Sequence, residues 1–336
     1  MYSLELSTER KFSSKRLLVA FAAMSLSVFV ALASAQDSSY PSRPITIIVP
    51  YSAGGGNDDV ARILAPRVSQ NIGQPVLVEN RPGASGMIAG LYVSRSAPNG
   101  YTIMDDFTGI VINPWLYSKV LFDVRKDLAP ITLAVTLGSN LLVHPSLPVH
   151  NVKDLIALAK AQPGKLSYSS PGIGSPMHIE MEIFKKRAGV DIVHVPYKGG
   201  APATMAILAN EVQVIFSGTT GLPHVQAGKL RAIATTGLTR SSLLPDVPTV
   251  AESGLEGYSS VSWMGFFAPA KTPASIISRL NAEFVKALKM PDVTKQFEAG
   301  NMSVVGSTPE AFRKTIEEDF LRYGKIIQEL GIKKMD

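Results

Sequence analysis

The fold is decided by one stretch near the N-terminal end, Ile45-Thr-Ile-Ile-Val-Pro-Tyr-Ser-Ala-Gly-Gly-Gly-Asn-Asp58. It opens with a short apolar run rich in β-branched residues, which predicts a buried strand. A glycine loop follows, and beyond it apolar residues recur at helical spacing from Val60 to Ile72. The stretch therefore predicts a strand, a tight loop and a helix, which is the repeating unit of an α/β protein.

The same alternation continues along the chain and predicts mostly parallel sheets covered by helices. Further strands are expected at 76–78, 101–104, 131–136, 141–143, 166–169, 192–195, 212–216, 230–235 and 262–268, and helices at 152–161, 176–188 and 201–209. Two late helices should begin at Thr272-Pro273 and Thr308-Pro309, with threonine as the N-cap and proline at the first helical position.

Composition favours a globular protein with a small-molecule partner. The chain has 336 residues, enough for about two domains, and 46% of them are hydrophobic against 18% charged. The net charge is +6, but the basic residues are scattered, which argues against nucleic acid and favours small anions. Cysteine is absent, so thiol catalysis, disulfides and thiolate metal sites are excluded. No cofactor and no metal are expected.

The N-terminal residues resemble an export signal. Basic residues between positions 10 and 16 precede an apolar run at 17–32, and Ala33-Ser34-Ala35 fits the small-residue cleavage rule. We therefore expect a signal peptide at 1–35 and a mature chain that begins at Gln36. The alternative is an uncleaved membrane anchor, but the run of 16 residues is shorter than the ~20 that a spanning helix needs.

Two glycine-rich loops, Tyr51–Asp58 and Ser169–Pro176, carry the functional signal. Each joins a strand to a helix, so glycine lets the backbone approach a ligand while the helix presents unpaired N–H groups and its positive end. Such a loop can hold an anion without lysine or arginine. The two loops together predict a carboxylate site in a cleft between two lobes, and the alternative is a pair of ordinary tight turns. Neither loop has a nucleotide-binding fingerprint.

Catalytic patterns are poor. The five histidines form no close metal-ligand pair, and no G-x-S-x-G elbow occurs. Glu180 and Glu182 are two residues apart on a predicted helix and point to different faces. His178 lies in the first turn after the second loop, where it could touch a ligand or serve as a helix-end or core residue. No catalytic residue is assigned.

Short segments spread over nearly all of the chain beyond the leader carry a family resemblance. They are Tyr40-Pro-Ser-Arg-Pro-Ile45, Ala53-Gly-Gly-Gly-Asn-Asp58, Gly73-Gln-Pro-Val76, Val78-Glu-Asn-Arg-Pro-Gly-Ala84, Pro98-Asn-Gly-Tyr-Thr102, Ile112-Asn-Pro114, Val195-Pro-Tyr-Lys-Gly199, Ala227-Gly-Lys-Leu-Arg-Ala232, Leu244-Pro-Asp-Val-Pro-Thr-Val-Ala251 and Ser262-Trp263. In this order and number, they resemble the Bug family, the solute-binding components of tripartite tricarboxylate transporters.

The resemblance implies a type II periplasmic-binding-protein fold of the Venus flytrap kind, in which two α/β lobes joined by a hinge close on a ligand. It implies a periplasmic protein of a Gram-negative bacterium that binds a di-, tri- or aromatic carboxylate and passes it to integral membrane permease subunits. We expect lobe 1 at 36–138 and 254–336, lobe 2 at 139–253, and a monomer that binds no nucleic acid. The alternatives are a sensor subunit for a signalling receptor and, less favoured, a periplasmic hydrolase.

In the family, backbone amides of the two strand-to-helix loops hold the ligand's carboxylates, partly through water. Carried over here, these loops are Ser52–Asp58 and Ser170–Ser175. The candidate ligand-binding residues are Tyr51, Ser52, Ala53, Gly54, Gly55, Gly56, Asn57, Asp58, Phe107, Ser170, Gly172, Ile173, Gly174, Ser175, His178 and Ser217.

Three departures from the family's pattern bear on the ligand. Asp105-Asp106-Phe107 replaces small residues; an inward acid would oppose an anion, so at least one should point outwards, while Phe107 could form an apolar wall. Ser217-Gly218 replaces an Asp-Asn pair, which disfavours an ammonium-bearing ligand. Pro171 and Ile173 make the second loop stiff and apolar. Together they favour a non-amino carboxylate with an apolar body, such as an aromatic acid.

Overall fold

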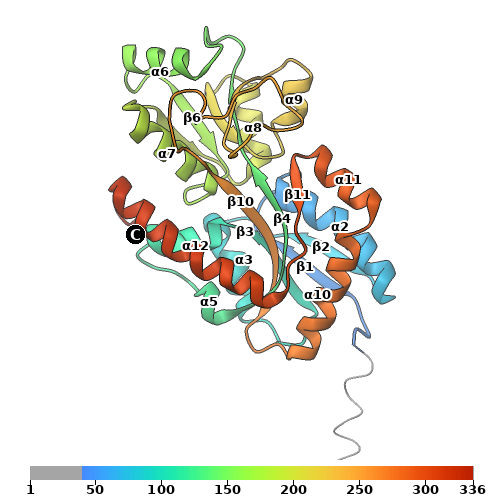
Figure 1. The fold of residues 1–336 in the computed structure, drawn as a ribbon. Coiled ribbons are helices and arrows are strands. Elements are labelled where there is room, and N and C mark those ends of the chain that lie inside the picture. The colour runs from blue at the N-terminus through green and yellow to red at the C-terminus, as the bar shows by residue number, and fades with distance from the viewer. Residues whose placement is uncertain (1–39, 336) are drawn as a thin grey trace, which may run out of the picture. The chain divides into compact units, whose positions relative to one another are not determined.

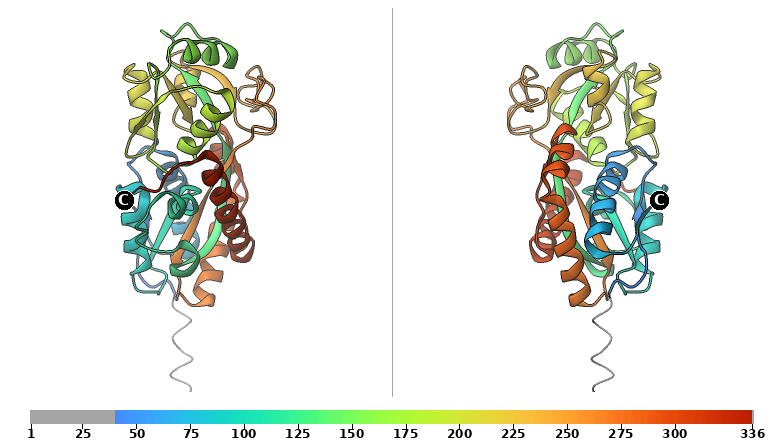
Figure 2. Two further views of the ribbon diagram at one scale, coloured as in Figure 1. Left: turned by 90° about the vertical axis from the view of Figure 1, so that its left-hand side faces the viewer. Right: turned by 90° about the vertical axis from the view of Figure 1, so that its right-hand side faces the viewer.

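The computed structural model describes residues 40–335, so the expected signal peptide and its cleavage site lie outside the described residues. Two β-sheets, each with helices packed on it, organise residues 43–335 (Figures 1 and 2). We call the first sheet with its helices the first lobe, and the second sheet with its helices the second lobe. None of the helices between residues 40 and 335 is both long enough and apolar enough to cross a membrane.

The first lobe is built on a six-stranded sheet with the order β11-β4-β10-β3-β1-β2. Its strands are β1 (Ile45–Val49), β2 (Val76–Asn80), β3 (Thr102–Phe107), β4 (Leu128–Gly138), β10 (Val261–Pro269) and β11 (Met302–Val304). Strand β1 pairs in parallel with β2 and β3, whereas β10 runs antiparallel to both β3 and β4. The predicted strand–loop–helix unit at residues 45–72 is therefore present as β1 followed by α2 (Gly56–Ile72).

Helices cover both faces of this sheet. The helices of the first lobe are α2, α3 (Met87–Ser94), α4 (Gly109–Leu116), α5 (Val124–Asp127), α10 (Ala274–Leu288), α11 (Pro291–Ala299) and α12 (Pro309–Leu330), with a 3-10 turn η2 at Ala84–Gly86. Apolar residues of α3, α4 and α12 share one core cluster with Met104 and Phe267 of the sheet. Phe266 packs on Phe284 of α10 with the ring centroids 4.2 Å apart.

The second lobe has a five-stranded sheet with the order β7-β6-β8-β5-β9. Its strands are β5 (Asn140–Val143), β6 (Ser167–Ser170), β7 (Val193–Pro196), β8 (Val214–Ser217) and β9 (Arg231–Thr235), and its helices are α6 (Val152–Ala161), α7 (Pro176–Ala188), α8 (Gly200–Leu208) and α9 (Leu222–Gln226). Ala203 and Ile207 of α8 pack with Leu142 and Ile215 of the sheet in a buried cluster.

The sheets are mixed, so the expectation of mostly parallel sheets is wrong. In the second lobe β6 is parallel to β7 and β8, but β5 is antiparallel to β8 and β9. Four of the five antiparallel pairs involve strands that enter a sheet from the other lobe, namely β5, which follows β4 after Ser139, and β10, which follows residues 236–260.

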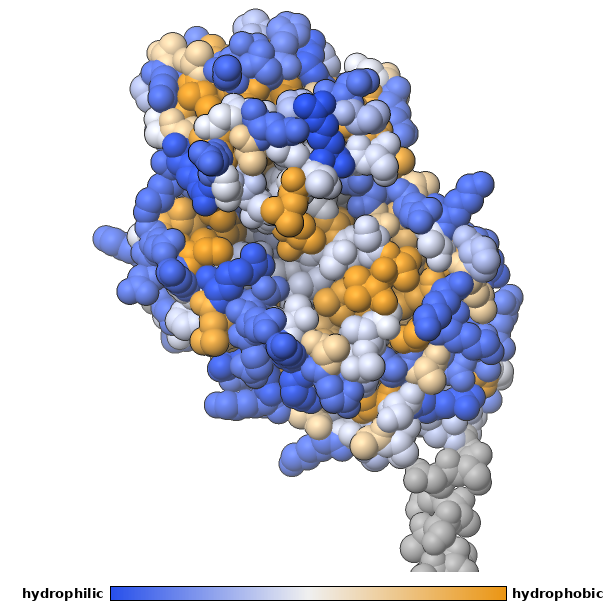
Figure 3. All heavy atoms as spheres, in the orientation of Figure 1, coloured by the Kyte–Doolittle hydropathy of each residue, from blue (hydrophilic) through white to orange (hydrophobic). Residues whose placement is uncertain are grey.

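The chain crosses between the sheets twice, and the two crossing segments are tied together. It leaves the first sheet at Gly138 and returns to it at Val261. The Ser139 N–H donates to Thr236 Oγ1 over 2.8 Å, and that hydroxyl donates to the Ser260 carbonyl, also over 2.8 Å. The lobe boundaries expected at residues 139 and 254 stay predictions. Figure 3 shows a mostly hydrophilic face with a hollow in its middle, bordered by apolar residues.

One of the two expected helix starts is confirmed and the other is wrong by one residue. Thr308 caps α12 by accepting the Ala311 N–H, with Pro309 at the first helical position. Helix α10 begins at Ala274, and its N-cap position is held by Pro273. The ψ angle of Pro273 is 142°, which is an extended conformation, so the proline stands outside the helix and Thr272 cannot cap it.

Candidate functional site

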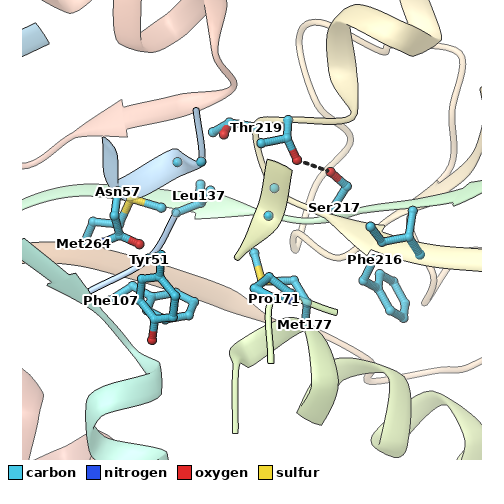
Figure 4. Close-up of a pocket in the computed structure, with 16 residues that line it drawn as sticks. Tyr51, Asn57, Phe107, Leu137, Pro171, Met177, Phe216, Ser217, Thr219 and Met264 are labelled. Carbon is cyan, nitrogen blue, oxygen red and sulfur yellow. Dashed lines mark hydrogen bonds between the residues drawn. The ribbon is translucent and has the colours of Figure 1, made fainter. Parts of the chain in front are cut away.

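A cavity lies between the lobes, where the carboxyl ends of strands from both sheets face each other (Figure 4). The cavity has a volume of about 40 Å³, room for only a few water molecules at about 10–15 Å³ each. The cavity is lined by Tyr51, Gly55, Gly56, Asn57, Phe107, Leu137, Pro171, Met177, Gly200, Ile215, Phe216, Ser217, Gly218, Thr219, Thr220 and Met264.

The first glycine loop is held in shape by Asp58. Its Oδ2 accepts the Gly54 N–H and the Arg62 Nε–H, each over 2.9 Å, and Oδ1 accepts from the Asn80 side chain. Burial alone would raise the pKa of Asp58, but the hydrogen bonds from Arg62, Gly54 and Asn80 outweigh it and lower the pKa. Gly54 has φ +75°, a left-handed conformation that favours glycine. Asp58 therefore shapes the loop and does not line the cavity.

The start of α2 presents free donors to the cavity. Gly55 is the N-cap, and no side chain caps it. Gly55, Gly56 and Asn57 all line the cavity, and within residues 40–335 their backbone N–H groups donate to no protein acceptor. The first N–H groups of a helix lack intrahelical partners and lie at the positive end of its dipole. This end of the cavity is therefore suited to an anion.

A second helix start, from the other lobe, meets the first. Helix α8 begins at Gly200, and its N-cap Gly199 offers no side-chain cap. A Cβ placed on Gly55 would lie only 3.7 Å from the Gly200 nitrogen. The lobes are joined beside this point, because Ser52 donates to the Lys198 carbonyl through its N–H (3.2 Å) and its Oγ (2.8 Å). Two positive helix ends from opposite lobes therefore converge on one part of the cavity.

The loop after β8 adds hydroxyl groups at the same place. Thr219 Oγ1 lies 3.2 Å from the position that a Cβ on Gly56 would take, and Thr220 Oγ1 lies 3.5 Å from that of Gly200. Ser217 Oγ accepts the Gly221 N–H over 2.9 Å and lies 3.3 Å from Thr220 Oγ1. Ser217 thus lines the cavity and also fixes the loop that carries both threonines.

The second predicted loop lies mostly away from the cavity, and only Pro171 of this loop lines it. The Ser175 hydroxyl caps α7 by accepting the His178 N–H, and the Gly174 N–H donates to His178 Nδ1 over 3.3 Å. The Ile173 carbonyl accepts from Ser85 Oγ of the first lobe over 2.7 Å. This loop therefore bridges the lobes, although its role in binding a ligand stays a prediction.

Two stacked histidines contact the second glycine loop. His178 and His194 stack with centroids 4.3 Å apart, Tyr168 stacks on His194 at 4.7 Å, and His194 Nε2 lies 2.7 Å from Ser170 Oγ. Burial lowers the pKa of His178 to about 4. Burial, followed by the neighbouring His178, lowers the pKa of His194 to about 3. Both rings are neutral near pH 7, so His178 can accept the Gly174 N–H.

An aromatic pair closes the opposite side of the cavity. Tyr51 and Phe107 meet edge to face with centroids 4.9 Å apart, and both line the cavity. Asp105 and Asp106 are buried without lining the cavity, so the expectation that at least one of these acids points away from the ligand stays a prediction. Burial raises the pKa of Asp106 to about 8, and burial together with the charge of Asp106 raises the pKa of Asp105. Protonated acids can be buried without opposing an anion.

The structure thus places the sixteen candidates in two groups. Tyr51, Gly55, Gly56, Asn57, Phe107 and Ser217 line the cavity, whereas Ser52, Ala53, Gly54, Asp58, Ser170, Gly172, Ile173, Gly174, Ser175 and His178 do not. Sequence reasoning predicted a helix at 201–209 but missed that its start lines the cavity, and it also missed the two threonines and the methionines Met177 and Met264. The pair Gly199-Gly200 between a strand and a helix is the signal that could have identified this helix start as part of the site.

Comparisons with known proteins agree with this architecture. The sequence profile described as "Tripartite tricarboxylate transporter family receptor" matches residues 60–332. A protein from the tcbD-tcbE intergenic region of Pseudomonas sp. strain P51 is 37% identical over 293 residues, or 87% of each chain. The structure of the periplasmic binding protein BugD superposes with a TM-score of 0.85 at 31% identity, over 88% of this chain and 100% of that one. The R. palustris protein Rpa4515, solved with adipate, superposes with a TM-score of 0.86 at 33% identity, over 88% of this chain and 100% of that one.

Proposed function

Because the chain belongs to the tripartite tricarboxylate transporter receptor family, we propose that it captures a small carboxylate in the periplasm and delivers it to the integral membrane permease of such a transporter. On this proposal the protein binds its ligand reversibly and is not an enzyme. Support comes from relatives that are periplasmic binding proteins, one of them solved with a dicarboxylate.

The observation that carries the proposal is the convergence of two helix starts at the cavity. Gly55, Gly56 and Asn57, whose N–H groups have no protein acceptor within residues 40–335, line the cavity at the start of α2, and Gly200 lines it at the start of α8. A charge-assisted hydrogen bond contributes about 1.5–3 kcal/mol, and a micromolar complex needs about 8 kcal/mol. Three or four such bonds contribute about 4.5–12 kcal/mol before the costs of association, so apolar contact with the ligand body must supply the rest.

The same geometry explains why a ligand would favour closed lobes. Bringing the starts of α2 and α8 together places two partial positive charges side by side. A carboxylate between Gly55 and Gly200 would cancel that repulsion and accept hydrogen bonds from both lobes. Since the cavity holds only a few waters in the present arrangement, the lobes must part or side chains must move before a ligand enters.

Native mass spectrometry of the freshly exported protein tests the proposal. We expect a complex that releases a small organic acid on denaturation, and a chain that begins at Gln36. Calorimetry with the released acid should show reversible binding without turnover, and cells that lack the protein should lose uptake of the labelled acid. Chemical conversion of the acid, or normal uptake without the protein, would contradict the proposal.

A further inference from the structure

We propose that the cavity selects acids with a single carboxylate on an apolar body, and that Met177 and Met264 are specificity-determining residues. This inference rests on the proposed function, because it narrows which carboxylate the site holds. It follows from the unequal distribution of polar and apolar groups around the cavity, and from the reach of the two methionines.

The donors suited to an anion are gathered at one end. The Gly200 nitrogen lies 3.7 Å from a Cβ position on Gly55, and Thr219 Oγ1 lies 3.2 Å from one on Gly56. Thr220 Oγ1 is 3.5 Å from the Cβ position of Gly200. The start of α8 thus lies beside the start of α2, and each start has a threonine hydroxyl next to it. This end of the cavity can take one carboxylate, held from both lobes.

The remainder of the lining carries no charge and, apart from Asn57, Ser217 and Gly218, is apolar. The apolar part consists of Tyr51, Phe107, Leu137, Pro171, Met177, Ile215, Phe216 and Met264. Figure 4 shows Tyr51, Phe107, Pro171 and Met177 along one side of the cavity and Thr219 on the opposite side. Among the described residues that line the cavity there is no lysine, arginine, histidine, aspartate or glutamate. A second carboxylate or an ammonium group would therefore lose its hydration without gaining a charged partner.

Two methionines from opposite lobes reach the boundary between these regions. Met264 comes from β10, and its Cε lies 2.8 Å from a Cβ position on Gly56. Met177 is the second residue of α7, and its Cε lies 3.1 Å from a Cβ position on Gly218. Both are buried. Methionine is unbranched and adaptable, so these side chains can move aside for the ligand body and then pack against it.

Matched probe pairs test the selectivity by isothermal titration calorimetry. Hexanoate and adipate differ by a second carboxylate, and 3-phenylpropionate and phenylalanine differ by an ammonium group. We expect hexanoate, 3-phenylpropionate or both to bind. Hexanoate, if it binds, should bind at least tenfold more tightly than adipate, and 3-phenylpropionate, if it binds, at least tenfold more tightly than phenylalanine. Tighter binding of adipate or phenylalanine would overturn the inference and leave the proposed carboxylate capture intact. Failure of all four acids to bind would overturn the inference, whereas carboxylate capture itself is decided by the acid that co-purifies with the protein.

Variants test the role of the methionines. Met264→Gln and Met177→Gln keep the side-chain length but place an amide in the apolar wall, so the preference for the monocarboxylate should fall at least fivefold. Met264→Leu keeps the wall apolar and should retain the preference. If the glutamine variants do not fold, Met264→Ala should raise the affinity for 3-phenylpropionate relative to hexanoate by enlarging the cavity. If the ratios of the affinities for the probe acids stay at their wild-type values in all folded variants, the methionines do not set specificity.

Discussion

Gly55 and Gly200 begin helices in different lobes, yet the nitrogen of Gly200 lies 3.7 Å from the point where a Cβ on Gly55 would stand. The pair makes the candidate anion site a property of the two lobes together, because each lobe contributes one of the two helix starts.

Gly55→Ala should weaken carboxylate binding without disturbing the fold. Gly55 has φ −93° and ψ 168°, which any residue adopts, and the added Cβ would meet its nearest neighbours at 3.4 and 3.7 Å, ordinary contact distances. The methyl group would, however, occupy the space between the two helix starts. We expect at least a tenfold loss of affinity for the co-purified acid, measured by calorimetry, with a nearly unchanged melting temperature.

Gly138→Ala is the matched control for this change. A Cβ there would also meet its neighbours at ordinary distances, the nearest at 3.5 Å, but Gly138 does not line the cavity. Its affinity should stay within about twofold of wild type, a difference of roughly 0.4 kcal/mol. Wild-type affinity in Gly55→Ala would show that the anion does not lie between α2 and α8.

Local sequence patterns predicted the strand, loop and helix that form the first half of the candidate site. The run from Ile45 to Ile72 encodes its strand, loop and helix through neighbouring residues, and the structure forms them as β1 and α2. The second loop, Ser170–Ser175, has the same local pattern, but contacts with distant residues decide its place. Ser85 and His178 hold it between the lobes, and no local rule distinguishes such a bridge from a ligand loop.

Two other features of the candidate site could not be predicted from local sequence, because they depend on protonation and on tertiary contacts. We expected at least one of Asp105 and Asp106 to point away from the ligand because a charged carboxylate would oppose an anion, but burial raises the pKa of both groups. The approach of Gly200 to Gly55 joins residues 145 positions apart in the sequence. This approach depends on how the two sheets are arranged, and no local sequence pattern predicts it.

Asp106→Asn should stabilise the protein more as the pH rises. The folded-state pKa of Asp106 is raised to about 8 by burial, while an unfolded aspartate titrates near 3.9. The protonated acid therefore favours folding fully below about pH 4, and that stability is lost as the pH rises through 8. Asparagine keeps an acceptor for the Phe107 N–H, which now donates to Asp106 Oδ1 over 2.7 Å.

Thermal unfolding of both proteins between pH 4 and pH 9 measures this difference. We expect similar melting temperatures near pH 4 and an excess of at least about 5 °C for Asp106→Asn near pH 8. Taking the difference between the two proteins cancels the titration of other groups, including His178 and His194. If the difference in melting temperature between the two proteins stays constant from pH 4 to pH 9, Asp106 is ionised in the folded protein.

His178→Phe should loosen the second loop. The ring would still stack on His194, but the Gly174 N–H would lose its acceptor in a buried place. Leaving a buried donor unsatisfied costs about 1–3 kcal/mol, measurable as a lower free energy of unfolding in urea. His178→Asn supplies an oxygen at the δ position and should recover part of the loss. Faster hydrogen exchange at Gly174 in the phenylalanine variant alone would identify the broken contact.

Ser85→Ala should shift the protein towards an open arrangement of its lobes. Ser85 Oγ donates to the Ile173 carbonyl over 2.7 Å and lies 3.1 Å from Tyr117 Oη. Both Ser85 and Tyr117 belong to the first lobe, whereas Ile173 lies in the loop of the second. Removing the hydroxyl deletes a bond made only when the lobes meet, at a cost of about 0.5–1.5 kcal/mol. The apparent affinity for the ligand falls with the closed fraction, so we expect a loss of about twofold to tenfold.

Small-angle X-ray scattering should accompany the titration of Ser85→Ala. Without ligand the variant should have a larger radius of gyration than wild type, and saturating ligand should remove the difference, because a carboxylate between α2 and α8 holds the lobes from the other side of the loop. Ser94→Ala serves as the control, since Ser94 Oγ bonds only to the Leu91 carbonyl within its own helix. Equal radii and equal affinities for Ser85→Ala and wild type would show that this bridge does not govern closure.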